Sequence, residues 1–256
     1  MGVPIDGTTN NICANSGSRF FTNYVGNVDS VWKPISLTYV TYPEGDMVGK
    51  LLAWGSLLPI FIIVSFVTLI LFRREIHTMM FFVGMLLNET LNMVLKRYFR
   101  EARPCRPGDE SLLYSKHGMP SSHAQFMGFF ALYLIFFAYM RLKPHESEYF
   151  IVRKHVMAFS AFTSAIFVSI SRIYLHYHSL EQVGAGLLVG GVAGICWFFI
   201  VVTCLMPFAG QFVNTKVAEY FLIRDSSSIP DILWFEYAAT RSEARQRNKR
   251  TSSKSQ

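Results

Sequence analysis

The chain has 256 residues, of which 51% are hydrophobic, 15% aromatic and only 16% charged, and its net charge is +7. Soluble domains carry about a quarter charged residues, so this composition argues against a soluble globular domain. The positive charge alone could indicate a nucleic-acid partner, but its distribution is that of the flanks of membrane spans, and we expect no nucleic acid. Because the apolar residues are gathered into long runs, the chain is predicted to be an integral membrane protein.

Five apolar runs predict the fold class, an all-α bundle of about five transmembrane helices. Leu51–Phe72 is uncharged and long enough to cross a hydrocarbon core of ~30 Å. The expected spans are Leu51–Phe72, Ile76–Leu95, Ala124–Met140, His155–Ser171 and Leu180–Met206. The third and fourth are short, and we expect them to extend into their flanks. In the fifth, Gly186, Gly190 and Gly194 recur every fourth residue, which favours close packing against another helix.

The segments outside the spans divide the chain into three regions. Residues 1–46 form a polar N-terminal segment, 47–206 the transmembrane domain, and 207–256 an interfacial segment with a basic tail. In the last region, aromatic residues precede the basic end, which is typical of an interfacial helix followed by a loose tail. Cys13 and Cys105 could form a disulfide only if both face an oxidising compartment.

Helix parity places two loops on the same side of the membrane. Helix three leaves the side that helix two has reached, helix four returns and helix five leaves again, so the loops 96–123 and 171–179 open on one side. The other side receives Arg73, Arg74, the loop 141–154 and the basic tail. Since positive residues favour the cytosolic side, the tail is predicted to be cytosolic and the two loops lumenal or extracellular.

These two loops carry residues that suit phosphate chemistry. Lys96 and Arg103 are seven residues apart, and a continuing helix would place both on one face. Together with Arg172 they would form a cationic cage for a phosphate dianion. His123 and His178 belong to different loops and could supply a proton donor and a nucleophile.

Each of these residues also has an ordinary structural interpretation. Lys96 or Arg103 alone could be a charge that reaches the membrane interface. Ser122 and His123 could simply begin a helix, although the free N–H groups of that helix would also suit a phosphate near Ser121. The combination is more specific than its parts, because three separate segments with compatible spacing fall on one side.

Three motifs, Lys-x6-Arg-Pro, Pro-Ser-x-His and Ser-Arg-x5-His, occur in this order between Lys96 and Gln182. Together they resemble the type-2 phosphatidic acid phosphatase superfamily, whose members are membrane phosphatases that work without a metal or another cofactor. By that resemblance, His178 is the nucleophile that forms a phosphohistidine, and His123 protonates the leaving oxygen and later activates water. The residues implied to hold the phosphoryl oxygens are Lys96, Arg103, Arg172, Ser121 and Ser122.

Two positions depart from the usual motifs of that superfamily. Ser122 stands where Gly is usual, and its hydroxyl can donate a hydrogen bond to the phosphate. Gln182 stands where Asp is usual, four residues after His178. Its amide carbonyl can accept from the far ring nitrogen and so orient the imidazole, and glucose-6-phosphatases resemble this chain in having Gln there. Glu181 is expected to point elsewhere.

Helix two adds polar residues that the motifs do not cover. Glu89 and Asn92 lie within the span, and Asn88, Asn92 and Lys96 form a row at four-residue intervals. An ionisable side chain at this depth is expected to face the interior of the bundle. We interpret Glu89 and Asn92 either as orienting groups that position Lys96 or Arg172, or as packing hydrogen bonds to another helix.

The flanks of the motifs indicate a branch of the superfamily. The stretches WKPISLTYVTYPEGDMVG, LNETLNMVLK and YFLIRDSSSIPDILWFEYAATRSEARQRNK resemble the dolichyldiphosphatases over most of the chain from Trp32 to Lys249. The resemblance implies hydrolysis of dolichyl diphosphate to dolichyl phosphate and inorganic phosphate, at the lumenal face of the endoplasmic reticulum membrane. That reaction recycles the lipid carrier of protein N-glycosylation.

Several alternatives stay open at this point. The enzyme could act on another lipid phosphate or resemble a glucose-6-phosphatase, and a protein of another class could use the same cage as a phosphate-binding transporter or scaffold. An intact histidine pair argues against the scaffold, since binding alone needs no nucleophile. Four further cations could bind the phosphate that stays with the lipid or could be solvated loop charges: Arg97, Arg100, Arg106 and Lys116.

Overall fold

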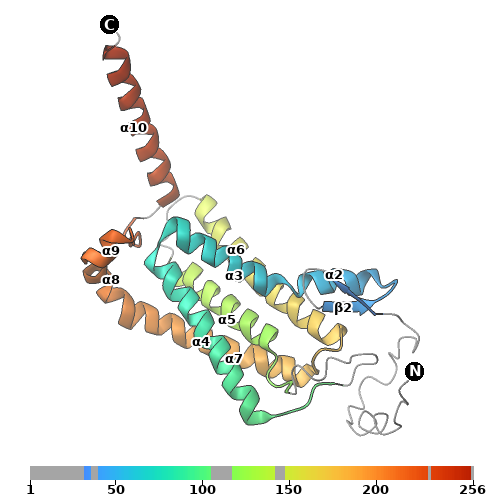
Figure 1. Ribbon diagram of the computed structural model, residues 1–256. Coiled ribbons are helices and arrows are strands. Elements are labelled where there is room, and N and C mark those ends of the chain that lie inside the picture. The colour runs from blue at the N-terminus through green and yellow to red at the C-terminus, as the bar shows by residue number, and fades with distance from the viewer. Residues whose placement is uncertain (1–31, 36–39, 105–116, 142–147, 230–231, 255–256) are drawn as a thin grey trace, which may run out of the picture.

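The computed structural model describes residues 32–35, 40–104, 117–141, 148–229 and 232–254. These residues form a bundle of helices preceded by one two-stranded antiparallel hairpin (Figure 1). In chain order the elements are β1 (Trp32–Ile35), β2 (Val40–Pro43), α2 (Met47–Gly55), α3 (Leu58–Arg73), α4 (Ile76–Phe99), α5 (Ser122–Phe136), the π-helical turn η2 (Phe137–Arg141), α6 (Glu148–Tyr174), α7 (Leu180–Ile200), the π-helical turn η3 (Val201–Leu205), α8 (Met206–Val213), α9 (Lys216–Tyr220) and α10 (Ile232–Lys254). The predictions that concern Cys13, Cys105, Arg106 and Lys116 lie outside the described residues.

Five helical stretches among the described residues are long and apolar enough to cross a membrane. They are Met47–Arg73, Ile76–Phe99, Ser122–Arg141, Ile151–Tyr174 and Leu180–Val213. The prediction of an all-α membrane bundle with about five spans is confirmed, and the hairpin is an addition that the sequence patterns did not indicate. The third and fourth spans extend into their flanks as expected, and the fifth helix continues beyond Met206 to Val213.

The first span is interrupted between α2 and α3, where one continuous helix was predicted. Pro59 lies in the first turn of α3, and proline has no N–H to donate to a preceding turn. Before it, the Leu57 N–H donates to the Trp54 carbonyl oxygen at 3.1 Å, and the Ser56 hydroxyl donates to the Ala53 carbonyl oxygen, 2.7 Å away. The break lets α2 pack against α6, and Asp46, at the start of α2, accepts a hydrogen bond of 3.0 Å from the Tyr174 hydroxyl at the end of α6.

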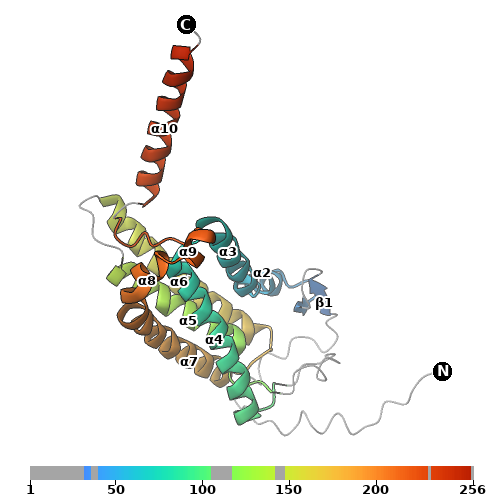
Figure 2. The ribbon, with the colours of Figure 1, turned by 60° about the vertical axis from the view of Figure 1, so that its left-hand side comes forward.

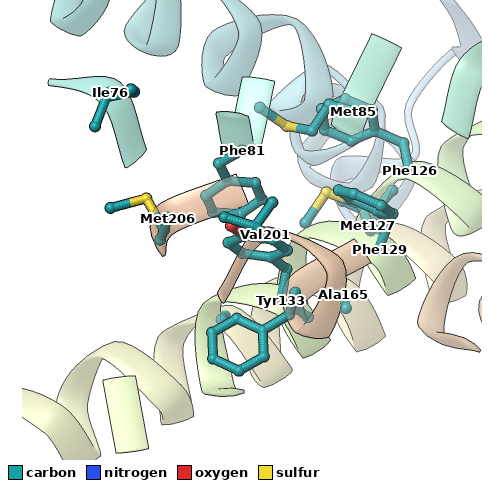
Figure 3. Packing of buried hydrophobic residues seen from close by; sticks show 14 of the residues in the cluster. Ile76, Phe81, Met85, Phe126, Met127, Phe129, Tyr133, Ala165, Val201 and Met206 are labelled. Carbon is teal, nitrogen blue, oxygen red and sulfur yellow. The ribbon is translucent and has the colours of Figure 1, made fainter. Parts of the chain in front are cut away.

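The core of the bundle is aromatic and centres on Tyr133 of α5 (Figure 3). Its ring stacks on Phe81 of α4 with the ring centroids 3.9 Å apart, and it meets Phe198 of α7 edge-on at 5.5 Å. Aromatic pairs of this kind are worth ~0.5–1.5 kcal/mol beyond the area that they bury. The cluster therefore joins three helices roughly three turns, or ~16 Å, along α5 from its N-terminus.

Helices α5 and α7 approach each other along the glycine row of the fifth span. A Cβ atom added at Gly186 would lie 2.7 Å from the Ser121 carbonyl oxygen, and one added at Gly190 would collide with the Gln125 carbonyl oxygen. Gly194 continues this row one turn further along. Backbone therefore touches backbone, which confirms the predicted close packing and draws the N-termini of α5 and α7 together.

Helix α10 projects away from the bundle in both views (Figures 1 and 2). A helix is present where an interfacial helix was predicted, but the basic end that we expected to be loose is helical as far as Lys254. The physical reason is local. Good helix formers such as Ala, Glu, Arg and Gln dominate this stretch, and Arg247 pairs with Glu243 one turn earlier at 2.8 Å.

Candidate active site

The two loops that parity placed on one side lie together at one end of the bundle, which we call the site end. The backbone N–H of Ser121, before α5, donates to the carbonyl oxygen of Gln182, in the first turn of α7, at 3.0 Å. The side-chain amide nitrogen of Gln182 donates in turn to the Ala102 carbonyl oxygen, beyond α4, at 2.9 Å. Hydrogen bonds therefore join the segments that carry all three motifs.

His178 is buried immediately before α7, with 3% of its surface exposed. Helix α6 ends at Tyr174, and the backbone then turns through His176, which has a left-handed φ of 55°. The His178 N–H returns to the Arg172 carbonyl oxygen at 3.3 Å. This turn brings the imidazole against Gln182, whose Oε1 lies 3.1 Å from His178 Nδ1.

Ser179 begins α7 through a capping box. Its hydroxyl accepts from the Gln182 N–H at 3.2 Å, and the Gln182 amide oxygen accepts from the Ser179 N–H at 3.4 Å. Serine at the N-cap with glutamine three residues later is the sequence signature of this motif. Gln182 thus caps the helix and contacts His178 with the same side chain, which ties the ring to the end of α7.

Three cations lie close to both histidines. The charges of Lys96, Arg103 and Arg172 act on His123 and on His178 alike. Arg172 is 5% exposed. Its guanidinium lies over the ring of Tyr177, 4.0 Å from the centroid, and the Tyr177 hydroxyl accepts from the Thr41 N–H of β2 at 3.0 Å. This cation–π contact supports the guanidinium from the side of Tyr177.

The electrostatics of the site keep His178 neutral. Its pKa is lowered to about 3, first by burial and then by the positive charges of Arg172 and Arg103, while the hydrogen bond to Gln182 acts in the opposite direction. A neutral imidazole retains a lone pair, as a nucleophile requires. A phosphate dianion bound among the cations would offset their repulsion of a positive charge on His178.

Arg103 reaches this cluster by a route different from the predicted one. We expected the helix to continue past Lys96, so that both cations shared a face. Instead α4 ends at Phe99, because Arg100 adopts a left-handed φ of 47° and its N–H donates to the Lys96 carbonyl oxygen at 3.2 Å. Pro104 also disfavours a helical conformation at Arg103. Arg103 therefore lies on a non-helical segment, yet its charge still acts on Lys96.

The N-terminus of α5 presents Ser121, Ser122 and His123. The helix begins at Ser122 with Ser121 as its N-cap, two residues before the predicted start at Ala124. Ser121 is fully buried, and its hydroxyl has no hydrogen-bond partner among the residues that the structure describes. A helix N-terminus carries partial positive charge and free N–H groups, so this turn is suited to an anionic oxygen.

A buried amide network supports this turn, and it includes a residue to which sequence reasoning assigned no role, Gln125. Asn92 donates to the Gln125 side-chain oxygen at 2.7 Å and to the Pro120 carbonyl oxygen at 3.3 Å. The Gln125 amide nitrogen donates to the backbone and side-chain oxygens of Asn88 at 3.1 and 3.0 Å. For Asn92 the structure thus favours the second interpretation, a packing hydrogen bond between helices. In the sequence, the only sign of a role for Gln125 was an amide side chain inside an apolar run.

Two acidic residues lie at the margin of the site. Glu89 is partly buried in α4, and its charge acts on Lys96 two turns along the helix. Glu181 is exposed, as are Arg97 and Arg100. Among the described residues, no group of three or more His, Cys, Asp and Glu side chains is placed to hold a metal ion.

Comparison with known proteins gives this arrangement a family. Residues 77–206 match the family model described as the PAP2 superfamily. The chain belongs to the PAP2 superfamily. The matched range contains Lys96, His123 and His178, so the resemblance inferred from three motifs is confirmed.

Curated relatives match the chain over most of its length. It is 45% identical to dolichyldiphosphatase 1 of Homo sapiens, over 88% of this chain and 95% of that protein. It is 37% identical to lipid phosphate phosphatase gamma of Arabidopsis thaliana, over 80% of this chain and 89% of that protein. A solved PAP2 structure, the first transmembrane PAP2 type phosphatidylglycerolphosphate phosphatase from Bacillus subtilis, aligns with a TM-score of 0.45 and 16% identity over 66% of this chain and 80% of that chain.

Proposed function

We propose that this protein hydrolyses dolichyl diphosphate to dolichyl phosphate and inorganic phosphate in the endoplasmic reticulum membrane, and thereby recycles the lipid carrier of protein N-glycosylation. The observation that carries the proposal is a pair of histidines from separate loops, His123 and His178, close to three cations. The choice of substrate is supported by the match to human dolichyldiphosphatase 1, which covers 95% of that protein.

The proposed reaction has two steps. His178 Nε2 attacks the terminal phosphorus, the bond from that phosphorus to the bridging oxygen breaks, and His123 gives a proton to the departing dolichyl phosphate. Water then attacks the phosphohistidine while His123 takes one of its protons, and inorganic phosphate leaves with His178 restored. This division of labour needs one neutral imidazole, and the lowered pKa of His178 supplies it.

The cage supplies the electrostatic part of catalysis. Phosphoryl transfer spreads charge over the equatorial oxygens, and fixed cations placed around them stabilise the transition state. Lys96, Arg103 and Arg172 would carry out this role together with the α5 N-terminus at Ser121 and Ser122. Because side chains provide this positive charge, we propose a phosphatase that requires neither a metal nor another cofactor.

The membrane orientation belongs to the same proposal. The site end is proposed to face the lumen, where a diphosphate headgroup would meet the basic rim while its polyprenyl tail stays in the bilayer. The other end, with Arg73, Arg74 and α10, is proposed to face the cytosol, which agrees with the excess of positive residues there. Protease protection of a C-terminal tag in sealed microsomes would contradict this orientation.

Purified protein in detergent, offered dolichyl diphosphate, phosphatidate and glucose 6-phosphate with and without EDTA, tests the function. We expect release of inorganic phosphate from dolichyl diphosphate, unchanged by EDTA, and its loss in the His178→Ala and His123→Ala variants. Full activity of His178→Ala would overturn the phosphohistidine mechanism. Loss of activity in EDTA would overturn metal independence.

The plant relative favours one second candidate, a broader lipid phosphate phosphatase. Lipid phosphate phosphatase gamma matches 80% of this chain, so the phosphatidate assay is the discriminating comparison. A kcat/KM for phosphatidate equal to that for dolichyl diphosphate would favour the second candidate. A preference of ten-fold or more for the diphosphate would exclude it.

A further inference from the structure

The segment between α4 and Arg103 carries a carboxylate, Glu101, at an unspecified position of the Lys-x6-Arg-Pro motif. Its Oε1 accepts a hydrogen bond from the Gln182 side-chain amide nitrogen at 2.8 Å. The same nitrogen donates to the Ala102 carbonyl oxygen at 2.9 Å. His178, Gln182 and Glu101 therefore form one chain of hydrogen bonds, although 81 residues separate Gln182 from Glu101 in the sequence.

These contacts determine which way round the Gln182 amide lies. A carboxylate and a backbone carbonyl can only accept hydrogen bonds, so the group that faces Glu101 and Ala102 is the amide NH2. The amide oxygen is thereby directed to the other side, where it faces His178 Nδ1 at 3.1 Å and the Ser179 N–H at 3.4 Å. In the reverse orientation, the amide oxygen of Gln182 would face the Glu101 carboxylate and the Ala102 carbonyl oxygen, and none of the three could donate a hydrogen bond.

The orientation of the amide in turn selects the tautomer of His178. An amide oxygen can only accept, so the nitrogen opposite it, Nδ1, carries the proton of the neutral ring. The second nitrogen, Nε2, is then left with a lone pair. If the amide rotated by half a turn, its NH2 would face Nδ1, the ring proton would move to Nε2, and Nε2 could no longer act as the nucleophile.

We propose that Glu101 is a positioning residue, which acts through Gln182 to hold His178 with Nε2 ready to attack; this inference rests on the function proposed above. Asp, which is usual at this position of the motif, would place one carboxylate against the imidazole directly. Here an amide touches the imidazole, and the carboxylate lies one residue beyond it. A carboxylate bonded to the amide NH2 also polarises the amide oxygen towards negative charge, which favours the cationic ring of a phosphohistidine.

Gly118 closes the space around the amide. A Cβ atom at this position would lie 2.7 Å from both Gln182 Nε2 and Oε1, and the Gly118 N–H donates to the Glu101 carbonyl oxygen at 2.6 Å. Glu101 is thus held by its backbone as well as by its side chain. A side chain at position 118 would therefore displace the Gln182 amide from its contact with Glu101.

The test is a double-mutant cycle between Glu101 and Gln182, with dolichyl diphosphate as substrate. We expect Glu101→Ala to lower kcat by roughly 10-fold, as is typical when a residue that orients a directly acting side chain is removed. KM should change less than two-fold. Glu101→Gln keeps an acceptor but loses the charge and should lie between wild type and Glu101→Ala. Gln182→Asp places a carboxylate against His178 directly, so Glu101→Ala in that background should cost less than two-fold. The exposed neighbour Glu181→Ala is the matched control and should behave as wild type.

Two results would overturn the proposal: an unchanged kcat in Glu101→Ala, or the same loss of kcat in the wild-type and Gln182→Asp backgrounds. A readout that does not depend on turnover is 15N NMR of histidine-labelled protein, with His178 assigned by its absence in His178→Ala. The wild-type protein and Glu101→Gln should show protonated Nδ1, and Glu101→Ala should shift towards protonated Nε2. If the wild-type protein released no phosphate from dolichyl diphosphate, the proposed function would fail, whereas a tautomer unaffected by Glu101 would refute only this inference.

Discussion

The two ends of the bundle use polar residues in opposite ways. At the site end, Arg172, His178 and Gln182 are at most 5% exposed, and Gln182 hydrogen-bonds to three other segments. At the opposite end, which we call the tail end, the side chains of Arg224 and Glu236 are 42% and 30% exposed, and their ion pair of 2.8 Å lies at the surface. The polar residues of the site end are buried and held in a single arrangement, whereas those of the tail end are partly exposed to solvent.

The tail end attaches α10 to the turn between α3 and α4. Glu236 of α10 pairs with Arg73 and Arg224, and Arg224 also pairs with Glu75 at 3.2 Å. The hydrogen bond from Arg73 is the main reason why the pKa of Glu236 lies below its ordinary value. Exposed pairs like these contribute ~0–1 kcal/mol, whereas a buried polar group that loses its partner costs ~1–3 kcal/mol. Substitutions should therefore have large effects at the site end and small effects at the tail end.

The largest expected effect is that of Arg172→Gln on activity. Removing one fixed cation from a phosphoryl-transfer site should reduce kcat by about 10²–10³-fold, as loss of one preorganised donor does elsewhere. Steady-state kinetics with dolichyl diphosphate would measure it, and Arg153→Gln on the same helix, outside the motifs, is the control. A reduction of less than ten-fold would show that Arg172 does not contact the transferred phosphoryl group.

The same variant changes the titration of His178. The pKa of His178 is about 3 in the folded protein and 6.5 in its ordinary state, and the Arg172 charge is the second cause of that difference after burial. Between these values the unfolded chain binds a proton that the folded protein does not, so stability falls as the pH falls through this window. Arg172→Gln should raise the pKa of His178 in the folded protein and so narrow the pH range over which stability changes. A 15N NMR titration of His178 would detect this shift. An unchanged midpoint would contradict the assigned cause.

The next effect in size is that of Gly190→Ala on stability. Its new Cβ would collide with the Gln125 carbonyl oxygen, and the two helices would have to separate. We expect a loss of ~1–3 kcal/mol, typical of overpacking. We also expect a lower kcat, because His123 lies on α5 and His178 immediately precedes α7. Gly184→Ala is the matched control on the same helix, where an added Cβ meets nothing within 4 Å.

Thermal unfolding in detergent compares the two glycine variants directly. Gly184→Ala should be neutral or stabilising by up to about 1 kcal/mol, because alanine favours a helix more than glycine does. Equal melting temperatures for the two variants would contradict the close contact between α5 and α7.

The spans were predictable because each is a long apolar run, and the glycine row because its spacing matches one face of a helix. The break before Pro59 and the end of α4 at Phe99 were harder to predict. Arg100 has a φ of 47°, a conformation that arginine does not favour, so nothing in the residue type predicts it. The surrounding structure imposes this conformation. Pro59 lies inside an uninterrupted apolar stretch, which reads as one span on hydrophobicity alone.

At the site, the motifs predicted which segments meet, but not the contacts behind them. His178 and Gln182 are one helical turn apart, so their contact follows from spacing. Glu101 and Gln125 find their partners 81 and 33 residues away, at distances for which spacing carries no information. Only the packing of α4, α5 and α7 decides that these amides and this carboxylate meet.

The amide network of α4 and α5 offers a smaller test at the site end. Gln125→Leu removes the partner of Asn88 and Asn92 and leaves buried polar groups unpaired, so we expect a loss of ~1–3 kcal/mol. Replacing both partners in Asn88→Leu/Gln125→Leu should recover part of that loss, because fewer polar groups stay buried without a partner. Thermal unfolding measures the stability of both variants. A double variant that is clearly less stable than Gln125→Leu alone would contradict this account.

The smallest expected effect is that of Glu236→Gln at the tail end. It should cost at most ~1 kcal/mol, less at high salt, and leave kcat unchanged, because exposed ion pairs are screened. Its pKa is lowered in the folded protein, so its contribution is present above the ordinary value of 4.5 and is lost as the pH falls through the folded value. Hydrogen exchange should be faster in the first turn of α10, which Glu236 attaches to Arg73 and Arg224.

The matched control is Glu243→Gln, which removes a pair with Arg247 that lies wholly within α10. It should leave exchange at the start of α10 unchanged, because no contact with α3 or Arg224 is lost. If Glu236→Gln instead lowered kcat, the two ends of the bundle would be coupled through its aromatic core. The contrast between a buried site end that is sensitive to substitution and a solvent-exposed tail end that tolerates substitution would then be wrong.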